Sequence, residues 1–118
     1  MAAQGYLGID AGTQGLSVVF TDENMQVLGT GDGEYKMSPG LAEGCYEQQP
    51  TDWQQALVDA MTDLRTKVSD IEVLSIGISG QMHGEVLVDE NDQPLKAARL
   101  WCDARNEDEG QQLSLIHI

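Results

Sequence analysis

Positive charge is scarce in this sequence. Six lysines and arginines stand against twenty aspartates and glutamates, which leaves a formal charge of −14 over 118 residues. A chain this acidic repels phosphodiester backbones and anionic lipid. We therefore expect no nucleic-acid partner and no membrane partner.

Cysteines and long apolar runs are also scarce. The two cysteines, Cys45 and Cys102, form no C-x-x-C pair, which argues against a disulfide framework or a zinc site and is typical of the reducing cytoplasm. No run approaches the roughly 18 apolar residues that a membrane span requires. The first four residues carry no basic, apolar signal segment. These absences together predict a cytoplasmic globular protein.

Apolar residues make up 41% of the chain, and their spacing predicts an α/β fold. Because Trp53, Leu57, Leu64 and their apolar neighbours recur on one helical face, we expect a helix from Pro50 to Val68. The strand-helix-strand order around it favours a right-handed crossover. The expected strands are a β-meander over 6–10, 16–20 and 27–35, with a bulge favoured by its glycines, and a buried parallel strand over 73–78.

The rest of the chain gives weaker patterns. Residues 37–50 are expected to form an irregular loop, and residues 85–98 a hairpin about the turn at 90–92. Residues 99–102 have a strand-like composition, and Asp103 could cap a helix running through Glu109.

The last six residues, 113–118, follow a polar stretch without any terminating signal. They resemble the translation of a sequencing adapter, so we interpret them as a non-native tail and give His117 no role. The alternative is a native strand that continues beyond the end of the sequence.

Three short segments could carry chemistry. The first is Asp10-Ala11-Gly12-Thr13-Gln14-Gly15, between two predicted strands. A carboxylate at a strand end can hold Mg²⁺ directly or through water, and two glycines let backbone N–H groups approach a phosphate. The segment is no P-loop, because neither a Gly-Lys-Ser/Thr sequence nor a helix follows. The alternative is an ordinary glycine-rich hairpin.

The second segment, Gly80-Gln81-Met82-His83-Gly84, directly follows a predicted parallel strand, where α/β sheets bind ligands. Gln81 and His83 can exchange hydrogen bonds with a hydroxylated substrate, and Met82 supplies an apolar wall. The alternative is a tight turn with a solvated histidine.

The third segment is Leu100-Trp101-Cys102-Asp103-Ala104-Arg105. An indole beside an acid and a guanidinium suits a sugar pocket. The alternative, which this segment alone favours, has Trp101 in the core, Asp103 capping a helix and Arg105 paired with a neighbouring carboxylate.

In this order and spacing, the three segments resemble the N-terminal part of an FGGY-type carbohydrate kinase, with the Gln-Met-His-Gly sequence closest to the xylulokinase branch. Residues 8–15 resemble the family's phosphate-binding opening, 77–84 its substrate loop and 100–105 a further substrate-side segment. Tyr46–Pro50 ahead of Trp53 resembles the entry to its first helix. The resemblance covers about residues 5–112, so we expect residues 1–112 to be the incomplete first domain of such a kinase.

The resemblance implies a ribonuclease H-like fold of the actin/hexokinase ATPase type, with β-meander, crossover helix and parallel strand in its partial first domain. It implies ATP and Mg²⁺ as cofactors and transfer of the γ-phosphoryl group to a ketose, D-xylulose giving D-xylulose 5-phosphate. It allows a homodimer of the full-length enzyme.

The resemblance also implies roles for individual residues. Asp10 would be catalytic and hold Mg²⁺ through water, and the aspartate general base belongs to a later part of the family's chain, so this chain alone is expected to be inactive. The phosphate-binding residues would be Gly12, Thr13, Gln14 and Gly15, and the substrate-binding residues Gln81, Met82, His83, Trp101 and Asp103.

Three other functions compete with this one. Another FGGY sugar or polyol kinase would share all three segments. A non-metabolic actin-like ATPase, such as a chaperone or filament protein, would share the Asp10 segment but has no reason to carry 81–84 or 101–105. A free-standing binding module would lack catalysis.

Overall fold

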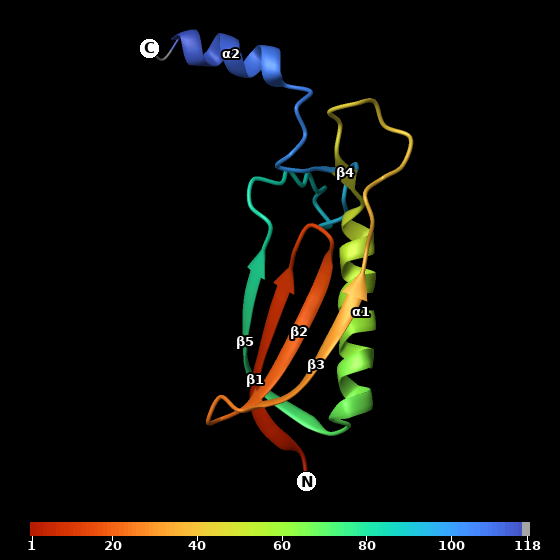
Figure 1. The fold of residues 1–118 in the computed structure, drawn as a ribbon, viewed down its shortest axis with the longest axis vertical. Coiled ribbons are helices and arrows are strands. Elements are labelled where there is room, and N and C mark those ends of the chain that lie inside the picture. The colour runs from red at the N-terminus through yellow and green to blue at the C-terminus, as the bar shows by residue number, and fades with distance from the viewer. Residues whose placement is uncertain (117–118) are drawn as a thin grey trace. The chain divides into compact units, whose positions relative to one another are not determined.

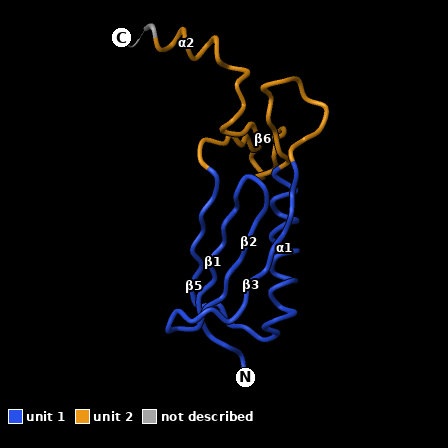
Figure 2. Tube along the Cα trace, viewed as in Figure 1, with its two compact units in different colours: residues 1–36, 50–81 blue, residues 37–49, 82–118 orange. Residues whose placement is uncertain are grey.

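The structure, a computed structural model, describes residues 1–116. The chain divides into two compact units (Figure 2). The first contains residues 1–36 and 50–81, and the second contains residues 37–49 and 82–118. Each unit is described by itself.

The first unit is built on a four-stranded sheet in the order β3-β2-β1-β5 (Figure 1). The strands are β1 (Ala3–Ala11), β2 (Gly15–Asp22), β3 (Val27–Glu34) and β5 (Ile71–Gly80). The first three form an antiparallel meander, and β5 pairs with β1 in parallel. The predicted meander and parallel strand are therefore confirmed.

Helix α1 (Pro50–Lys67) covers β2 and β3 on one face of this sheet. Glycine at alternate positions of β3 lets the helix approach closely: a Cβ atom on Gly31 would lie 2.0 Å from the carbonyl oxygen of Ala60. The predicted bulge is present at Leu28, where β3 slips against β2. The predicted helix is confirmed, and its apolar face closes the core, which consists of Leu7, Leu16, Val18, Phe20, Tyr35, Ala56, Ala60 and Leu64.

The expected burial of the parallel strand is wrong. Leu74, Ile76 and Ile78 of β5 are 45%, 55% and 76% exposed. The reason is position: β5 is the edge of the sheet, and α1 packs against β2 and β3 instead. An apolar run shows that a strand can be buried, but it does not show which element covers it.

The second unit has little regular structure. Two-residue strands β4 (Glu47–Gln48) and β6 (Ala98–Arg99) pair antiparallel, so the segment expected to be an irregular loop contributes a strand. The predicted hairpin over 85–98 is present as a turn whose arms are joined by two isolated antiparallel bridges, Val88 to Pro94 and Glu85 to Arg99, although no strand is assigned to residues 85–97.

The predictions for residues 99–109 are also corrected. The chain turns directly after β6, and α2 (Glu107–Ile116) begins four residues beyond Asp103, which therefore does not cap it. Trp101 is 58% exposed, so the alternative that placed it in the core is wrong.

Helix α2 continues across the boundary expected at residue 112. The adapter origin of residues 113–118 stays a prediction. His117 and Ile118 lie outside the described residues.

Candidate functional site

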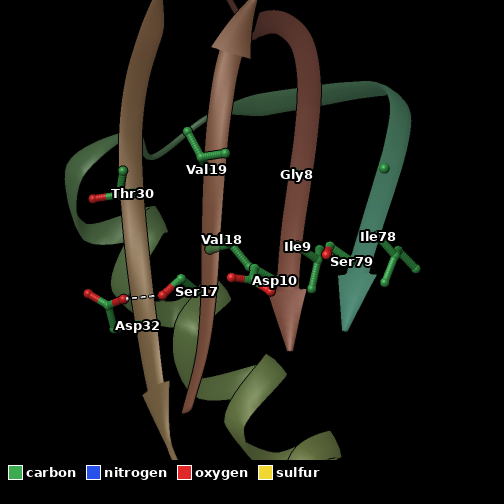
Figure 3. A pocket seen from close by; sticks show the side chains of 11 residues that line it. Gly8, Ile9, Asp10, Ser17, Val18, Val19, Thr30, Asp32, Ile78 and Ser79 are labelled. Atoms are coloured by element: carbon green, nitrogen blue, oxygen red, sulfur yellow. Dashed lines mark hydrogen bonds between the residues drawn. The ribbon is translucent and has the colours of Figure 1, made fainter. Parts of the chain in front are cut away.

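Asp10 lies near the end of β1, on the sheet face opposite α1. The strand register shows which face this is. Gly31 and Gly33 of β3 face the helix, so Asp32 between them faces the other way. Asp32 pairs with Ser17 and Ser17 pairs with Asp10, so Asp10 shares the face of Asp32. Asp10 is exposed and lines a shallow groove of about 700 Å³ on the open face (Figure 3).

A row of polar residues crosses the sheet at the level of Asp10. Ser79 of β5 pairs with Asp10, Asp10 with Ser17, and Ser17 with Asp32. The Ser17 hydroxyl donates to Asp32 Oδ1 at 2.8 Å, as Figure 3 shows. The row offers hydroxyl and carboxylate groups at the carboxyl ends of β1 and β5, where sheets of this class bind ligands.

The turn from β1 to β2 is held from inside the unit. The Gly12 N–H donates to the Gly15 carbonyl at 3.0 Å. The buried Tyr35 hydroxyl contacts the Gly12 carbonyl and lies 2.9 Å from the Gly15 carbonyl. The Tyr35 ring is tilted against Trp53, with 6.5 Å between ring centroids. The predicted phosphate loop therefore has a fixed backbone.

Burial and the neighbouring Asp10 carboxylate raise the pKa of Tyr35 above its ordinary value. The phenol therefore stays protonated at neutral pH and remains a hydrogen-bond donor to the loop. Sequence reasoning missed this residue, because only the register of the meander brings the end of β3 beside the β1–β2 turn.

The parallel pairing of β1 with β5 brings two of the predicted segments together. The Gln81 N–H donates to the Ala11 carbonyl at 3.0 Å. The Thr13 hydroxyl donates to Gln81 Oε1 at 3.3 Å. The predicted phosphate loop and Gln81 of the predicted substrate loop are thus joined by both backbone and side chain.

Asp103 anchors the second unit. Its side chain is only 4% exposed. It accepts hydrogen bonds from the Tyr46 N–H at 2.8 Å, from the Arg105 N–H at 3.1 Å and from Arg105 Nε at 2.9 Å. Arg105 also pairs with Glu47 at 2.9 Å. The pairing of Arg105 with a neighbouring carboxylate, expected in the structural alternative, is confirmed.

The hydrogen bond from Arg105 is the main reason that the pKa of Asp103 lies well below its usual range, with the two backbone N–H groups adding to it. The carboxylate is ionised, and protein donors already engage both of its oxygens. It fixes the geometry of the Trp101–Arg105 segment, and direct contact with a sugar stays a prediction.

A second pocket, of about 320 Å³, lies within the second unit. It brings together three of the predicted substrate residues, His83, Trp101 and Asp103, whereas Gln81 and Met82 are not among its lining residues. Leu100 and Arg105, which also line it, belong to the third predicted segment, whereas sequence reasoning missed Glu85, Arg99 and Asn106. Met82 is exposed.

His83 has a positive φ of 57°, a conformation that is uncommon for a residue with a side chain. Such backbone strain clusters at ligand sites. His83 lines the pocket, so the strained backbone coincides with a residue predicted to bind the substrate.

Within residues 1–116, no three acidic, histidine or cysteine side chains gather as a cluster that could hold a metal ion. Asp10 is a single exposed carboxylate at the end of β1, and its role in holding Mg²⁺ through water stays a prediction. In the described part of the chain, no helix has the length and apolar character to cross a membrane.

Comparison with known proteins gives one family. A sequence model of the N-terminal domain of the FGGY family of carbohydrate kinases matches residues 5–116. Xylulose kinase of Haemophilus influenzae is 40% identical over 115 residues, covering 92% of this chain and 23% of that protein.

Solved structures show the same fold. The crystal structure of a xyloylose kinase from Brucella ovis superposes with a TM-score of 0.83 at 37% identity, covering 92% of this chain and 22% of that one. Glycerol kinase of Plasmodium falciparum, solved with ADP, superposes with a TM-score of 0.81 at 24% identity, covering 97% and 23%. The predicted actin/hexokinase-type fold is confirmed. The chain spans less than a quarter of the length of each of these proteins.

Proposed function

Because the chain belongs to the FGGY family of carbohydrate kinases, we propose that it forms the N-terminal, phosphate- and sugar-binding part of a kinase that phosphorylates a ketose. The proposed acceptor is D-xylulose, and the proposed product is D-xylulose 5-phosphate. Xylulose kinases among the relatives support this substrate. We propose ATP as the phosphoryl donor, Mg²⁺ as its counterion and the cytoplasm as the location.

The observation that carries the proposal is the junction between Thr13 and Gln81. It joins the turn suited to phosphate to the start of the loop suited to a sugar, inside one compact unit. Phosphoryl transfer depends chiefly on positioning the two reactants and on stabilising charge on the phosphate oxygens. A kinase needs this adjacency, and a module that binds only one ligand does not.

Each residue has a defined task in the proposed reaction. Asp10 would hold Mg²⁺ through water, and the ion, when bound, supplies positive charge for the phosphate oxygens. The turn from Gly12 to Gly15, fixed by Tyr35 and by the hydrogen bond from the Gly12 N–H to the Gly15 carbonyl, would receive the phosphates through its remaining backbone N–H groups. Because the chain carries a charge of −14, stabilisation of the phosphates must be local.

The proposed sugar contacts come from the second unit. His83 and Trp101 would supply a polar edge and a flat apolar face to the sugar, while Asp103 keeps the Trp101–Arg105 segment in place through Arg105 and Tyr46. A site whose buried polar groups pair with the hydroxyls of the sugar rejects analogues that lack those hydroxyls, because the groups are then left unpaired.

The test is a chimera in which this chain replaces the matching N-terminal segment of Haemophilus influenzae xylulose kinase, to which it is 40% identical. ADP release is measured with D-xylulose, D-ribulose, xylitol, glycerol and no acceptor. We expect the highest kcat/KM with D-xylulose. Preference for xylitol or glycerol would indicate another FGGY kinase, and turnover that ignores the acceptor would indicate a non-metabolic ATPase. The 118-residue chain alone is expected to release no ADP with D-xylulose.

A further inference from the structure

Arg99 lies in the pocket of the second unit with its backbone held on both sides. It pairs with Glu47 across the β4–β6 ladder. On the other side, the Glu85 N–H donates to the Arg99 carbonyl at 2.9 Å. Both cross-strand neighbours of this arginine are therefore glutamates, and opposite charges in such positions usually pair.

Neither glutamate pairs with Arg99. Glu47 lies 2.9 Å from Arg105, and Glu85 lies 2.7 Å from Lys96. The hydrogen bond and the charge of Lys96 lower the pKa of Glu85, and the charge of Arg99 adds a smaller effect, so this carboxylate is ionised and its hydrogen bond goes to Lys96. Among residues 1–116, no acidic side chain forms a salt bridge with Arg99.

The Arg99 guanidinium also has an unsatisfied donor. Its Nε atom is buried and has no hydrogen-bond partner among the described residues. A buried N–H without an acceptor lowers stability, and a ligand that supplies the acceptor regains that free energy on binding. A chain with twenty acidic residues thus leaves the Nε–H of this arginine without an acceptor inside a pocket.

The other groups in the pocket indicate what kind of ligand would supply the acceptor. The carboxylates of Glu85 and Asp103 line the same space, and they oppose a multiply charged anion such as a phosphate. Asn106, His83 and the Trp101 ring add mixed donors, acceptors and an apolar face. A neutral polyhydroxylated ligand suits this mixture better than an anion does.

We propose that Arg99 determines sugar specificity by donating from Nε and a terminal guanidinium nitrogen to two neighbouring oxygens of the ketose. The planar guanidinium presents these donors side by side, in a fork that two adjacent sugar oxygens can accept. The inference rests on the proposed sugar-kinase function and adds to it a residue that chooses among sugars by the placement of their oxygens.

The test titrates the 118-residue chain with D-xylulose and follows the ¹H–¹⁵N signals of the backbone and of arginine Nε. We expect the Arg99 Nε–H signal to shift and Arg99→Gln to raise Kd at least about tenfold, the loss expected for a buried hydrogen bond to a charged donor. Arg99→Lys keeps the charge but not the fork, and it should also weaken binding. The matched control is Arg65→Gln, because Arg65 lies on α1 in the first unit.

The variants are compared only where their amide spectra show the fold of the unsubstituted chain. A Kd unchanged by Arg99→Gln overturns the proposal, as does an Arg99 signal that responds to inorganic phosphate and not to D-xylulose. Absence of sugar binding by the folded, unsubstituted chain overturns it as well. The proposed function is judged separately, by acceptor-dependent ADP release from the chimeric kinase.

Discussion

Replacement of Tyr35 by phenylalanine tests whether the predicted phosphate loop is fixed from within the first unit. The substitution keeps the buried ring and its contact with Trp53 but removes the hydroxyl that reaches the Gly12 and Gly15 carbonyls. A net hydrogen bond contributes about 0.5–1.5 kcal/mol. Because both glycines are partly exposed and water can replace the lost donor, we expect a loss of about 1 kcal/mol or less.

The assay combines urea unfolding with amide hydrogen exchange. We expect a lower urea midpoint with an unchanged slope, and faster exchange confined to the β1–β2 turn. Tyr6→Phe is the matched control, since Tyr6 lies in β1 and its hydroxyl has no hydrogen bond within the described residues. If Tyr35→Phe behaves as Tyr6→Phe does, the Tyr35 hydroxyl does not hold the loop.

Alkaline pH gives the same experiment a second readout. The pKa of Tyr35 is raised in the folded state from an ordinary value of 10.0, so above pH 10 the unfolded chain loses this proton before the folded chain does. The contribution of Tyr35 to stability is therefore complete below pH 10 and is lost as pH rises through the folded-state pKa. We expect the stability difference between the wild type and Tyr35→Phe to shrink above pH 10, and a constant difference would contradict the assigned burial.

Three further substitutions test other parts of the account. Gly31→Ala should lower the free energy of unfolding by about 1–3 kcal/mol in urea titrations, because the new Cβ would lie 2.0 Å from a backbone oxygen of α1. Gly77→Ala is the control and should not lower it in this way, because no atom lies within 4 Å of its new Cβ. In the chimeric kinase, Asp10→Asn should reduce kcat far more than it raises the sugar KM, and near-normal turnover would remove Asp10 from the mechanism. His83→Ala should weaken sugar binding by about 1–3 kcal/mol in calorimetric titrations while ATP affinity stays constant, and equal loss of both would indicate a folding defect.

The first unit could be predicted from sequence because its signals are local. The period of apolar residues defines α1, and alternating strands with short turns define the meander. The exposure of β5 could not be predicted, because a run of apolar residues carries no information about the element that packs on it. The Tyr35 contact could not be predicted either, since it depends on the register of two strand pairs.

The second unit depends on pairings that are remote in sequence. The strand at Glu47–Gln48 exists because Ala98–Arg99 lies beside it, and Glu47–Gln48 has no strand pattern of its own. Asp103 resembles a helix cap locally, yet its carboxylate is taken by the N–H of Tyr46, 57 positions earlier. Arg99 forms no salt bridge with its two glutamate neighbours because they pair with Arg105 and Lys96 instead. Only the folded structure shows these two pairs.

We propose that this chain supplies a working phosphate loop and sugar loop to a ketose kinase. The most direct measurement is kcat/KM for D-xylulose of the chimera with Haemophilus influenzae xylulose kinase, relative to the unaltered Haemophilus enzyme, with the chimera shown to be folded. We expect a value within about tenfold of the unaltered enzyme, a difference of about 1.4 kcal/mol in transition-state stabilisation. A folded chimera that binds ATP but transfers no phosphoryl group to D-xylulose or to any other sugar or polyol would contradict it.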